Sequence, residues 1–147
     1  MNITEFLSPD DVCVGLAATD KARLLHDLAE RAAPRVNLDA GLIANELTKR
    51  ESLGSTGVGH GVGLPHARLA NLDRPFGLLA RLKRPIEFDA IDGVPVDVVF
   101  LLLLPAGAQG EHINALAAVA RQLRGAERLA ALRKAHDASA LFAAATA

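Results

Sequence analysis

The chain has 147 residues, half of them hydrophobic, and 16 basic against 17 acidic residues give a formal net charge of −1. This balance argues against a basic nucleic-acid binder, and no apolar run reaches the roughly 18 residues of a membrane span. A single cysteine, Cys13, excludes an internal disulfide and makes a cysteine-rich zinc site implausible. The opening segment has no basic region leading into an apolar stretch, so no signal peptide is expected. We therefore expect one cytoplasmic domain over residues 1–147, with no nucleic-acid partner and no membrane span.

The first third of the chain predicts a short strand and two helices. Residues 12–16 alternate weakly in hydrophobicity, which indicates a strand. Thr19 or Asp20 can cap a helix that Pro34 should stop. Asp39 can cap a second helix that ends near Arg50. The apolar positions expected to face inward are Ala22, Leu25, Leu28, Ala29 and Ala32 in the first helix and Leu42, Ile43 and Leu47 in the second.

The second half predicts strands and then helices. Residues 76–82 and 96–104 read as strands with a turn at Asp92-Gly93, and the second is apolar at nearly every position, as in a strand covered on both faces. A helix is expected from Glu111 to about Gly125, followed by one or two short helices. The apolar residues expected to face inward in this helix are Ile113, Leu116, Ala117, Ala120 and Leu123. The short helices that follow carry Leu129, Leu132, Leu141 and Phe142. This order of elements predicts an α/β fold in which a mixed β-sheet is flanked by helices.

The most unusual stretch is GVGHGVGLPH, residues 57–66, in which glycine recurs at every second position before a Pro-His pair. In an extended strand one side would carry only glycine, and the other would carry Val58, His60, Val62 and Leu64, with His66 continuing the pattern. Glycine allows close approach to the backbone. Pro65 stiffens the approach to His66, as the placement of a nucleophile requires.

Known glycine motifs do not fit this stretch. A P-loop would need Lys-Ser/Thr after Gly59, where His60-Gly61 stands, and the dinucleotide pattern Gly-x-Gly-x-x-Gly fails in every register. No Gly-x-Ser-x-Gly elbow exists. Two alternatives remain from the residues alone. One is a tight glycine turn beside a histidine without function, and the other is a metal site built from His60, His66 and His112.

Four segments together resemble one known family over essentially the whole chain. They are ITEFLSPDDVCVGLAATDK from Ile3, KRESLGSTGVGHGVGLPHARL around His66, PIEFDAIDGVPVDVVFLLLLPA from Pro85, and EHINALAAVARQL from Glu111. The resemblance is to IIA domains of the bacterial phosphotransferase system, in the fructose/mannitol class and its nitrogen-regulatory branch. The family fold, a mixed sheet flanked by helices, agrees with the fold expected from the pattern.

The resemblance implies roles for three residues. His66 matches the histidine that accepts the phosphoryl group on its tele nitrogen, His112 matches a supporting histidine, and Arg50 matches an arginine that stabilises charge. By spacing alone, Arg50 could instead be a favourable cation at a helix C-terminus, and His112 a solvated first-turn residue. Ser55, Thr56, His60 and Arg68 are further candidates for the pocket. The sequence departs from the family pattern at His60, where asparagine is usual, and at Ala67, where glycine is usual.

Two functions from different classes follow from the resemblance. The favoured one is a regulatory phosphoprotein that takes a phosphoryl group from an HPr-type or NPr-type carrier and controls targets such as sensor kinases or potassium-transport components. The alternative is a IIA component that relays phosphoryl groups to a fructose/mannitol-type sugar permease. The chain carries no permease segment and opens like the nitrogen branch, which favours the first. Neither function is expected to need a cofactor or a metal.

Overall fold

The computed structural model describes residues 1–107 and 109–147, apart from the side chains of Gln109 and Glu111. In these residues, the strands are β1 Val12–Leu16, β2 Gly57–Gly59, β3 Val62–Gly63, β4 His66–Leu69, β5 Phe76–Ile86 and β6 Val96–Pro105. The helices are α1 Lys21–Val36, α2 Ala40–Ser52, α3 Gln109–Gln122, α4 Ala126–Lys134 and α5 Ala138–Thr146, with 3-10 turns η1 Ile3–Glu5 and η2 Pro9–Asp11. No helix in the described part of the chain combines the length and apolar character needed to cross a membrane.

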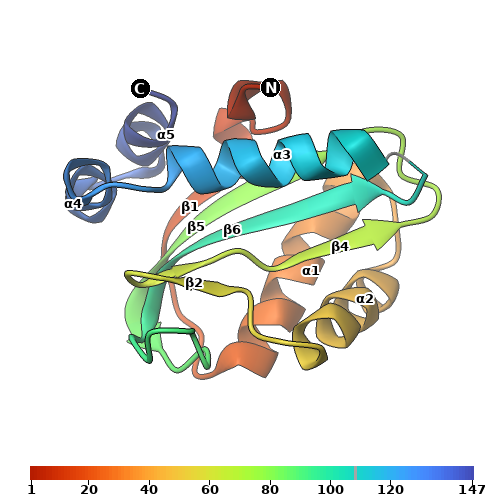
Figure 1. Cartoon of the computed structure of the whole chain (residues 1–147), viewed down its shortest axis with the longest axis horizontal. Helices are drawn as coiled ribbons and strands as arrows, with labels where there is room; N and C mark the ends of the chain where they lie inside the picture. The colour runs from red at the N-terminus through yellow and green to blue at the C-terminus, as the bar shows by residue number, and fades with distance from the viewer. Residues whose placement is uncertain (108) are drawn as a thin grey trace.

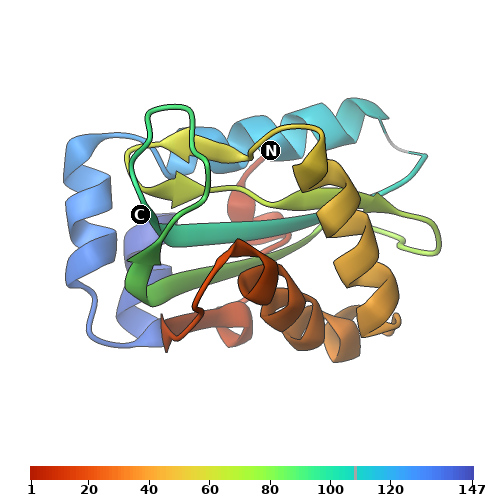
Figure 2. The same ribbon diagram turned by 90° about the horizontal axis from the view of Figure 1, so that it is seen from below.

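The strands of the described residues form one mixed, six-stranded sheet in the order β1-β5-β6-β3-β2, with β4 also paired to β6. Helix α3 crosses one face of the sheet, and α1 and α2 cover the other (Figure 1). Figure 2 shows α4 and α5 gathered at one end of the sheet. Two separate cores fill the spaces on either side of it. The predicted fold class, a mixed β-sheet flanked by helices, is confirmed.

Strand β6 supplies both cores because its side chains alternate between the two faces. Phe100 and Leu102 are fully buried on the side of α3, whereas Leu101 and Leu103 are fully buried on the side of α1 and α2. Burying one such side chain contributes about 1.5–3 kcal/mol. The prediction of a strand covered on both faces is confirmed.

The first two helices begin at the predicted caps but differ in detail from the prediction. Asp20 and Asp39 accept hydrogen bonds from the backbone N–H groups of Arg23 and Leu42. The expectation that Pro34 stops the first helix is wrong: α1 continues to Val36 and ends at Asn37, which takes the left-handed conformation. Pro34 lies in the last turn on the exposed side, where the carbonyl that loses its N–H partner can bind water.

Three expected inward faces also differ. In α1, Ala22 is exposed, and Leu24 joins the buried face instead. Leu42 is 46% exposed, because Ile43 and Leu47 set the buried face of α2 and Leu42 lies about 100° around the helix from Ile43. In α3 the expected stripe is wrong at Ile113, which is 66% exposed, and also at Ala117 and Ala120. The residues that α3 buries are Ala115, Ala118, Val119 and Leu123. An alanine-rich helix offers several similar faces, and the sheet selects the one that packs closest.

The glycine stretch is a tight hairpin, so its geometry agrees with the glycine turn that the sequence left open and not with a single extended strand. β2 and β3 pair antiparallel, and the turn between them has positive φ at Gly59, His60 and Gly61. At Gly61, φ is +80° and a Cβ atom would lie 2.5 Å from the Arg133 guanidinium. Val62 and Leu64 are therefore buried against the sheet, while Val58 stays exposed.

After the hairpin, the chain runs along one edge of β6 in two steps. β3 pairs parallel with Val98 and Val99, and β4 pairs parallel with the segment that begins at Leu102. Between them, the Pro65 carbonyl accepts a hydrogen bond of 3.0 Å from the Leu102 N–H. The Leu-Pro-His sequence is thus attached to β6 although Pro65 has no N–H to donate.

We predict that Gly61→Ala lowers the free energy of unfolding by about 1–2 kcal/mol, because an L-residue is strained at this positive φ. The new methyl group must also displace Arg133. Urea denaturation followed by circular dichroism measures the change. Gly107→Ala is the matched control, since a Cβ there meets no atom within 4 Å and its φ is not positive. Equal midpoints for Gly61→Ala and the wild type would contradict this account of the turn.

Candidate functional site

His66 is the first residue of β4, at the edge of the sheet where β4 pairs with β6. Its neighbour Ala67 packs into the core beneath α1 and α2, so the half-buried imidazole lies on the opposite face, toward α3. The Nδ1 atom lies 2.8 Å from the Leu64 carbonyl oxygen. A carbonyl only accepts, so Nδ1 carries the proton and Nε2 keeps its lone pair.

His112 stands beside His66. The two ring centroids are 6.3 Å apart and the ring planes meet at 81°. His112 lies in the first turn of α3, the helix that crosses one face of the sheet (Figure 1). Among the described residues, its buried Nδ1 atom finds no hydrogen-bond partner. A second imidazole with an unpaired ring nitrogen therefore lies beside the His66 ring.

Arg50 reaches the site from the last turn of α2. Its Nη1 atom donates a 3.0 Å hydrogen bond to the Gly54 carbonyl, which holds the loop that follows the helix. Its guanidinium is also close enough to lower the pKa of His66. Arg50 is therefore a cation at a helix C-terminus and also part of the electrostatic environment of His66.

Burial and nearby positive charge lower the pKa of both imidazoles and so favour their neutral forms. The pKa of His66 is lowered, first by burial and then by the charge of Arg50, against the raising effects of the Leu64 hydrogen bond and of Glu51. The pKa of His112 is lowered by burial, by Arg68 and by His66. Protonating either ring would place a cation in a partly dehydrated site that already contains arginines.

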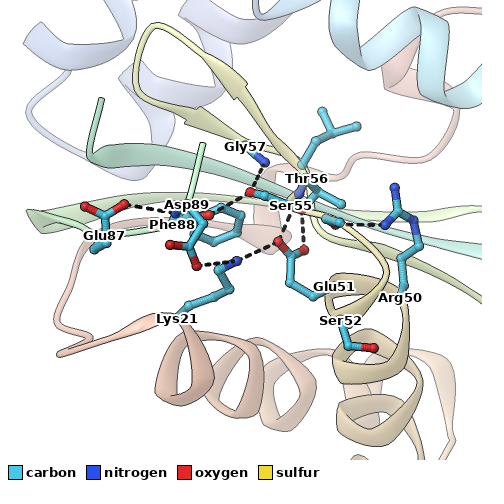
Figure 3. Close-up of polar contacts among 12 residues, drawn as sticks. Lys21, Arg50, Glu51, Ser52, Ser55, Thr56, Gly57, Glu87, Phe88 and Asp89 are labelled. Atoms are coloured by element: carbon cyan, nitrogen blue, oxygen red, sulfur yellow. Dashed lines mark hydrogen bonds and ion pairs between the residues drawn. The ribbon is translucent and has the colours of Figure 1, made fainter. Parts of the chain in front are cut away.

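The candidate hydroxyls are committed to other contacts. The Ser55 Oγ atom donates to the Phe88 carbonyl at 2.6 Å and accepts from the Gly57 N–H at 3.0 Å. The Thr56 side chain is buried and donates to Glu51 at 2.5 Å. Figure 3 shows both residues turned toward a cluster of polar side chains around Glu51 and Lys21, between α1, α2 and the start of β2. These contacts hold the loop that leads into β2.

Arg68 and His60 have different positions. Arg68 is exposed on the same face of β4 as His66, two residues along the strand. His60 lies at the hairpin tip, where its N–H donates to Asp92 and its carbonyl accepts from Arg133. That tip is beside the start of β6, roughly 16 Å along the strand from Leu102, the partner of His66.

The two departures from the family pattern have a structural reading. His60 has φ +57°, a left-handed conformation in which asparagine is favoured among non-glycine residues, so this position depends mainly on backbone geometry. Ala67 lies within β4 and is not among the residues with positive φ. Its methyl group adds to the core under α1 and α2. Neither departure places an unusual side chain between His66 and His112.

Sequence reasoning missed Glu51, a buried carboxylate at the end of α2. It follows Ile43 and Leu47 at four-residue spacing, on the face that the helix buries. A glutamate near a helix C-terminus is unfavourable, because its charge lies beside the partial negative charge of the helix dipole. An acidic residue that continues an apolar stripe into a helix C-terminus was therefore the available signal.

The arrangement suits an anionic ligand at a nitrogen nucleophile. Nε2 of His66 has a free lone pair, and the positive charges of Arg50 and Arg68 act on the two histidines. Among the described residues, no three histidine, cysteine, aspartate or glutamate side chains come together to hold a metal ion. The three-histidine metal site considered from the sequence is thus not assembled, because His60 lies at the far end of the hairpin.

Comparison with known proteins agrees with this geometry. The family model described as the phosphoenolpyruvate-dependent sugar phosphotransferase system, EIIA 2, matches residues 5–146. A nitrogen regulatory protein of Bradyrhizobium diazoefficiens is 43% identical over 142 residues, covering 97% of this chain and 93% of the relative. The crystal structure of nitrogen regulatory protein IIA-Ntr from Neisseria meningitidis superposes with a TM-score of 0.90 at 33% identity, covering 98% of this chain and 99% of that one.

A more distant structure shares the fold alone. The crystal structure of IIA mannitol from Escherichia coli has a TM-score of 0.80 at 12% identity, covering 95% of this chain and 98% of that one. The family match spans all the sheet strands and all five described helices, and the most similar relatives named above are nitrogen regulatory proteins. The chain therefore belongs to the type 2 EIIA family of the phosphotransferase system, in its nitrogen-regulatory branch.

Proposed function

We propose that the protein accepts a phosphoryl group on Nε2 of His66 from a phosphorylated HPr-type or NPr-type carrier. The Nε2 lone pair forms the new N–P bond, while the bond from phosphorus to the carrier breaks and its electron pair returns to the carrier. The phosphoryl group moves as a unit, and neither a cofactor nor a metal of this chain enters the step. Catalysis then consists mainly of positioning and charge stabilisation.

One observation carries this proposal: the hydrogen bond between His66 Nδ1 and the Leu64 carbonyl. It fixes the ring in one orientation and assigns the lone pair to Nε2, the nitrogen that the family resemblance names as acceptor. The lowered pKa of His66 supports the same role, because only a neutral imidazole can attack phosphorus. Arg50 and His112 are the candidates to stabilise charge on the phosphoryl oxygens.

The names of the relatives favour regulation over a relay to a sugar permease. A phosphoryl group adds roughly −1.5 to −2 charges if its second pKa resembles that of other phosphorylated side chains. On a half-buried histidine at the sheet edge, this charge would change which proteins can dock there. We propose that target proteins distinguish the two forms in this way. The proposal includes a single domain over residues 1–147, located in the cytoplasm.

His66→Ala should abolish labelling by the phosphorylated carrier while the protein stays folded, because no other nitrogen occupies the acceptor position. In the wild type, the label should be lost in acid and kept in base, as expected of an N–P bond. Autoradiography after acid and base treatment measures both. His26→Ala, at a histidine paired with Glu30 on the exposed face of α1, should label normally. An acid-stable label, or a label that persists in His66→Ala, would contradict the assignment of His66 as the phosphoryl acceptor.

Arg50→Ala and His112→Ala should each slow phosphorylation without moving the site of labelling. Removing one donor to developing charge typically costs about 100- to 1,000-fold in rate. Rapid-quench measurements with a fixed concentration of phosphorylated carrier give the rates, and peptide mapping gives the site. Transfer at the wild-type rate in either variant would show that the residue does not support the phosphoryl group.

Phosphorylation should persist to lower pH than an ordinary histidine allows. Since the folded-state pKa of His66 is lowered, the ring stays neutral below the usual value of about 6.5, and activity is lost only as pH falls through the lowered pKa. Arg50→Ala removes a positive charge, so it should move this pKa upward. NMR titration of the His66 ring measures the shift. Lys49→Ala, at an exposed lysine paired with Glu46, is the control, and an equal shift there would contradict a local effect of Arg50.

A further inference from the structure

We propose that Glu51 is a positioning residue for His66, and that its buried carboxylate fixes the imidazole through Thr56 and Leu64. The proposal rests on the function proposed above for His66 and adds a residue that does not touch the phosphoryl group. It assigns a role to the polar cluster beside the site, which the phosphoryl-transfer chemistry does not use.

The carboxylate of Glu51 has a demanding set of partners. Its side chain is 5% exposed and accepts hydrogen bonds from the Thr56 N–H at 2.9 Å, the Thr56 hydroxyl at 2.5 Å and the Lys21 ammonium at 3.0 Å. Lys21 also lies 3.6 Å from Asp89 and 4.7 Å from the centre of the Phe88 ring. Figure 3 shows Glu51 pointing into this cluster while the preceding residue, Arg50, points away from it.

The cluster connects to the nucleophile by consecutive hydrogen bonds. Thr56 is held by Glu51, and its carbonyl accepts from the Leu64 N–H at 3.0 Å. The carbonyl of Leu64 accepts from His66 Nδ1 at 2.8 Å. A shift of Thr56 would therefore move Leu64, whose carbonyl determines both the orientation and the tautomer of the His66 ring.

The contacts of Glu51 favour a carboxylate. One of its oxygens accepts from the Thr56 N–H and from Lys21, and the other accepts from the Thr56 hydroxyl. An amide would have to turn its NH₂ group toward that hydroxyl, which would reverse this hydrogen bond, and it would remove the negative charge that pairs with Lys21. Burying a charge costs free energy unless the charge is paired and hydrogen-bonded. The charge of Glu51 is also unfavourable beside the negative end of the α2 dipole. An uncharged apolar residue would fill the space but would leave the Thr56 N–H without its partner.

A purely structural role makes a different prediction. If Glu51 only stabilised the fold, a folded variant would keep the His66 ring as it is. If Glu51 positions the ring, replacing Glu51 must change which nitrogen of the His66 ring carries the proton. The ¹⁵N chemical shifts of the His66 ring report the tautomer directly, and they are read in the unphosphorylated protein.

The test uses Glu51→Gln in the full chain. In the wild type the ring should be in the Nδ1–H tautomer, and in Glu51→Gln a substantial Nε2–H fraction should appear. The rate of phosphorylation by the carrier should fall roughly 10- to 100-fold, as expected when a nucleophile is misplaced by up to about 1 Å. Glu46→Gln makes the same chemical change five residues earlier on α2, at an exposed pair with Lys49, and should leave both readings at wild-type values.

A second variant covers the case in which Glu51→Gln does not fold. Thr56→Val keeps the shape of the side chain and the backbone N–H but removes the hydroxyl donor, so it should shift the tautomer in the same direction. A folded Glu51→Gln, or otherwise Thr56→Val, with the wild-type tautomer would overturn the proposal. Because the tautomer is measured without phosphorylation, such a result would leave the acceptor role of His66 standing. Conversely, a tautomer shift in a protein that is never labelled would refute the proposed function alone.

Discussion

The position of His66 depends on the hydrogen bonds that attach residues 61–69 to one edge of β6. β6 is held in place by apolar burial on both faces, so it is a rigid reference for any strand that pairs with it. β3 and β4 pair with it on either side of Pro65, and the Pro65 carbonyl keeps the interrupted ladder in register. His66 directly follows Pro65, where the strand pairing is interrupted, and its backbone is fixed because it is the first residue of β4. It also lies at an edge where α3, rather than another strand, is the neighbour of its ring.

The electrostatics of the site follow from where this edge lies. The imidazole is half-buried, so water does not fully solvate a proton on it, and Arg50 adds a positive charge at close range. Desolvation is the larger of the two effects on its pKa, and the arginine reinforces it. The same positive charge that disfavours a proton on His66 favours an anion beside it. One arrangement of charge thus prepares the nucleophile and attracts the group that it would receive.

Among the described residues the interior is mostly apolar, and the polar cluster of Glu51, Lys21 and Thr56 is one of two exceptions, the other being Asp11 with its partner Arg35. Buried ion pairs contribute little net stability, because desolvation offsets most of their attraction. They do fix geometry, since each partner has few alternatives inside the protein. Here the cluster joins the start of α1, the end of α2 and the loop into β2, three segments that no strand pairing holds together. The conformation of the loop into β2 is therefore fixed by these hydrogen bonds and the ion pair rather than by apolar burial.

The sequence by itself determined the fold class, the cap at Asp39, a first cap at Thr19 or Asp20, and the buried strand around Phe100, because these depend on local periodicity and hydrogen-bonding chemistry. It singled out the Pro-His pair by its stiffness and its family resemblance. Only the tertiary structure decided that the glycine stretch folds back as a hairpin, which removes His60 from the site, and that α3 buries an alanine face instead of Ile113. It also revealed Glu51. Such choices rest on contacts between residues far apart in the chain, and the energies of these contacts do not appear in any local pattern.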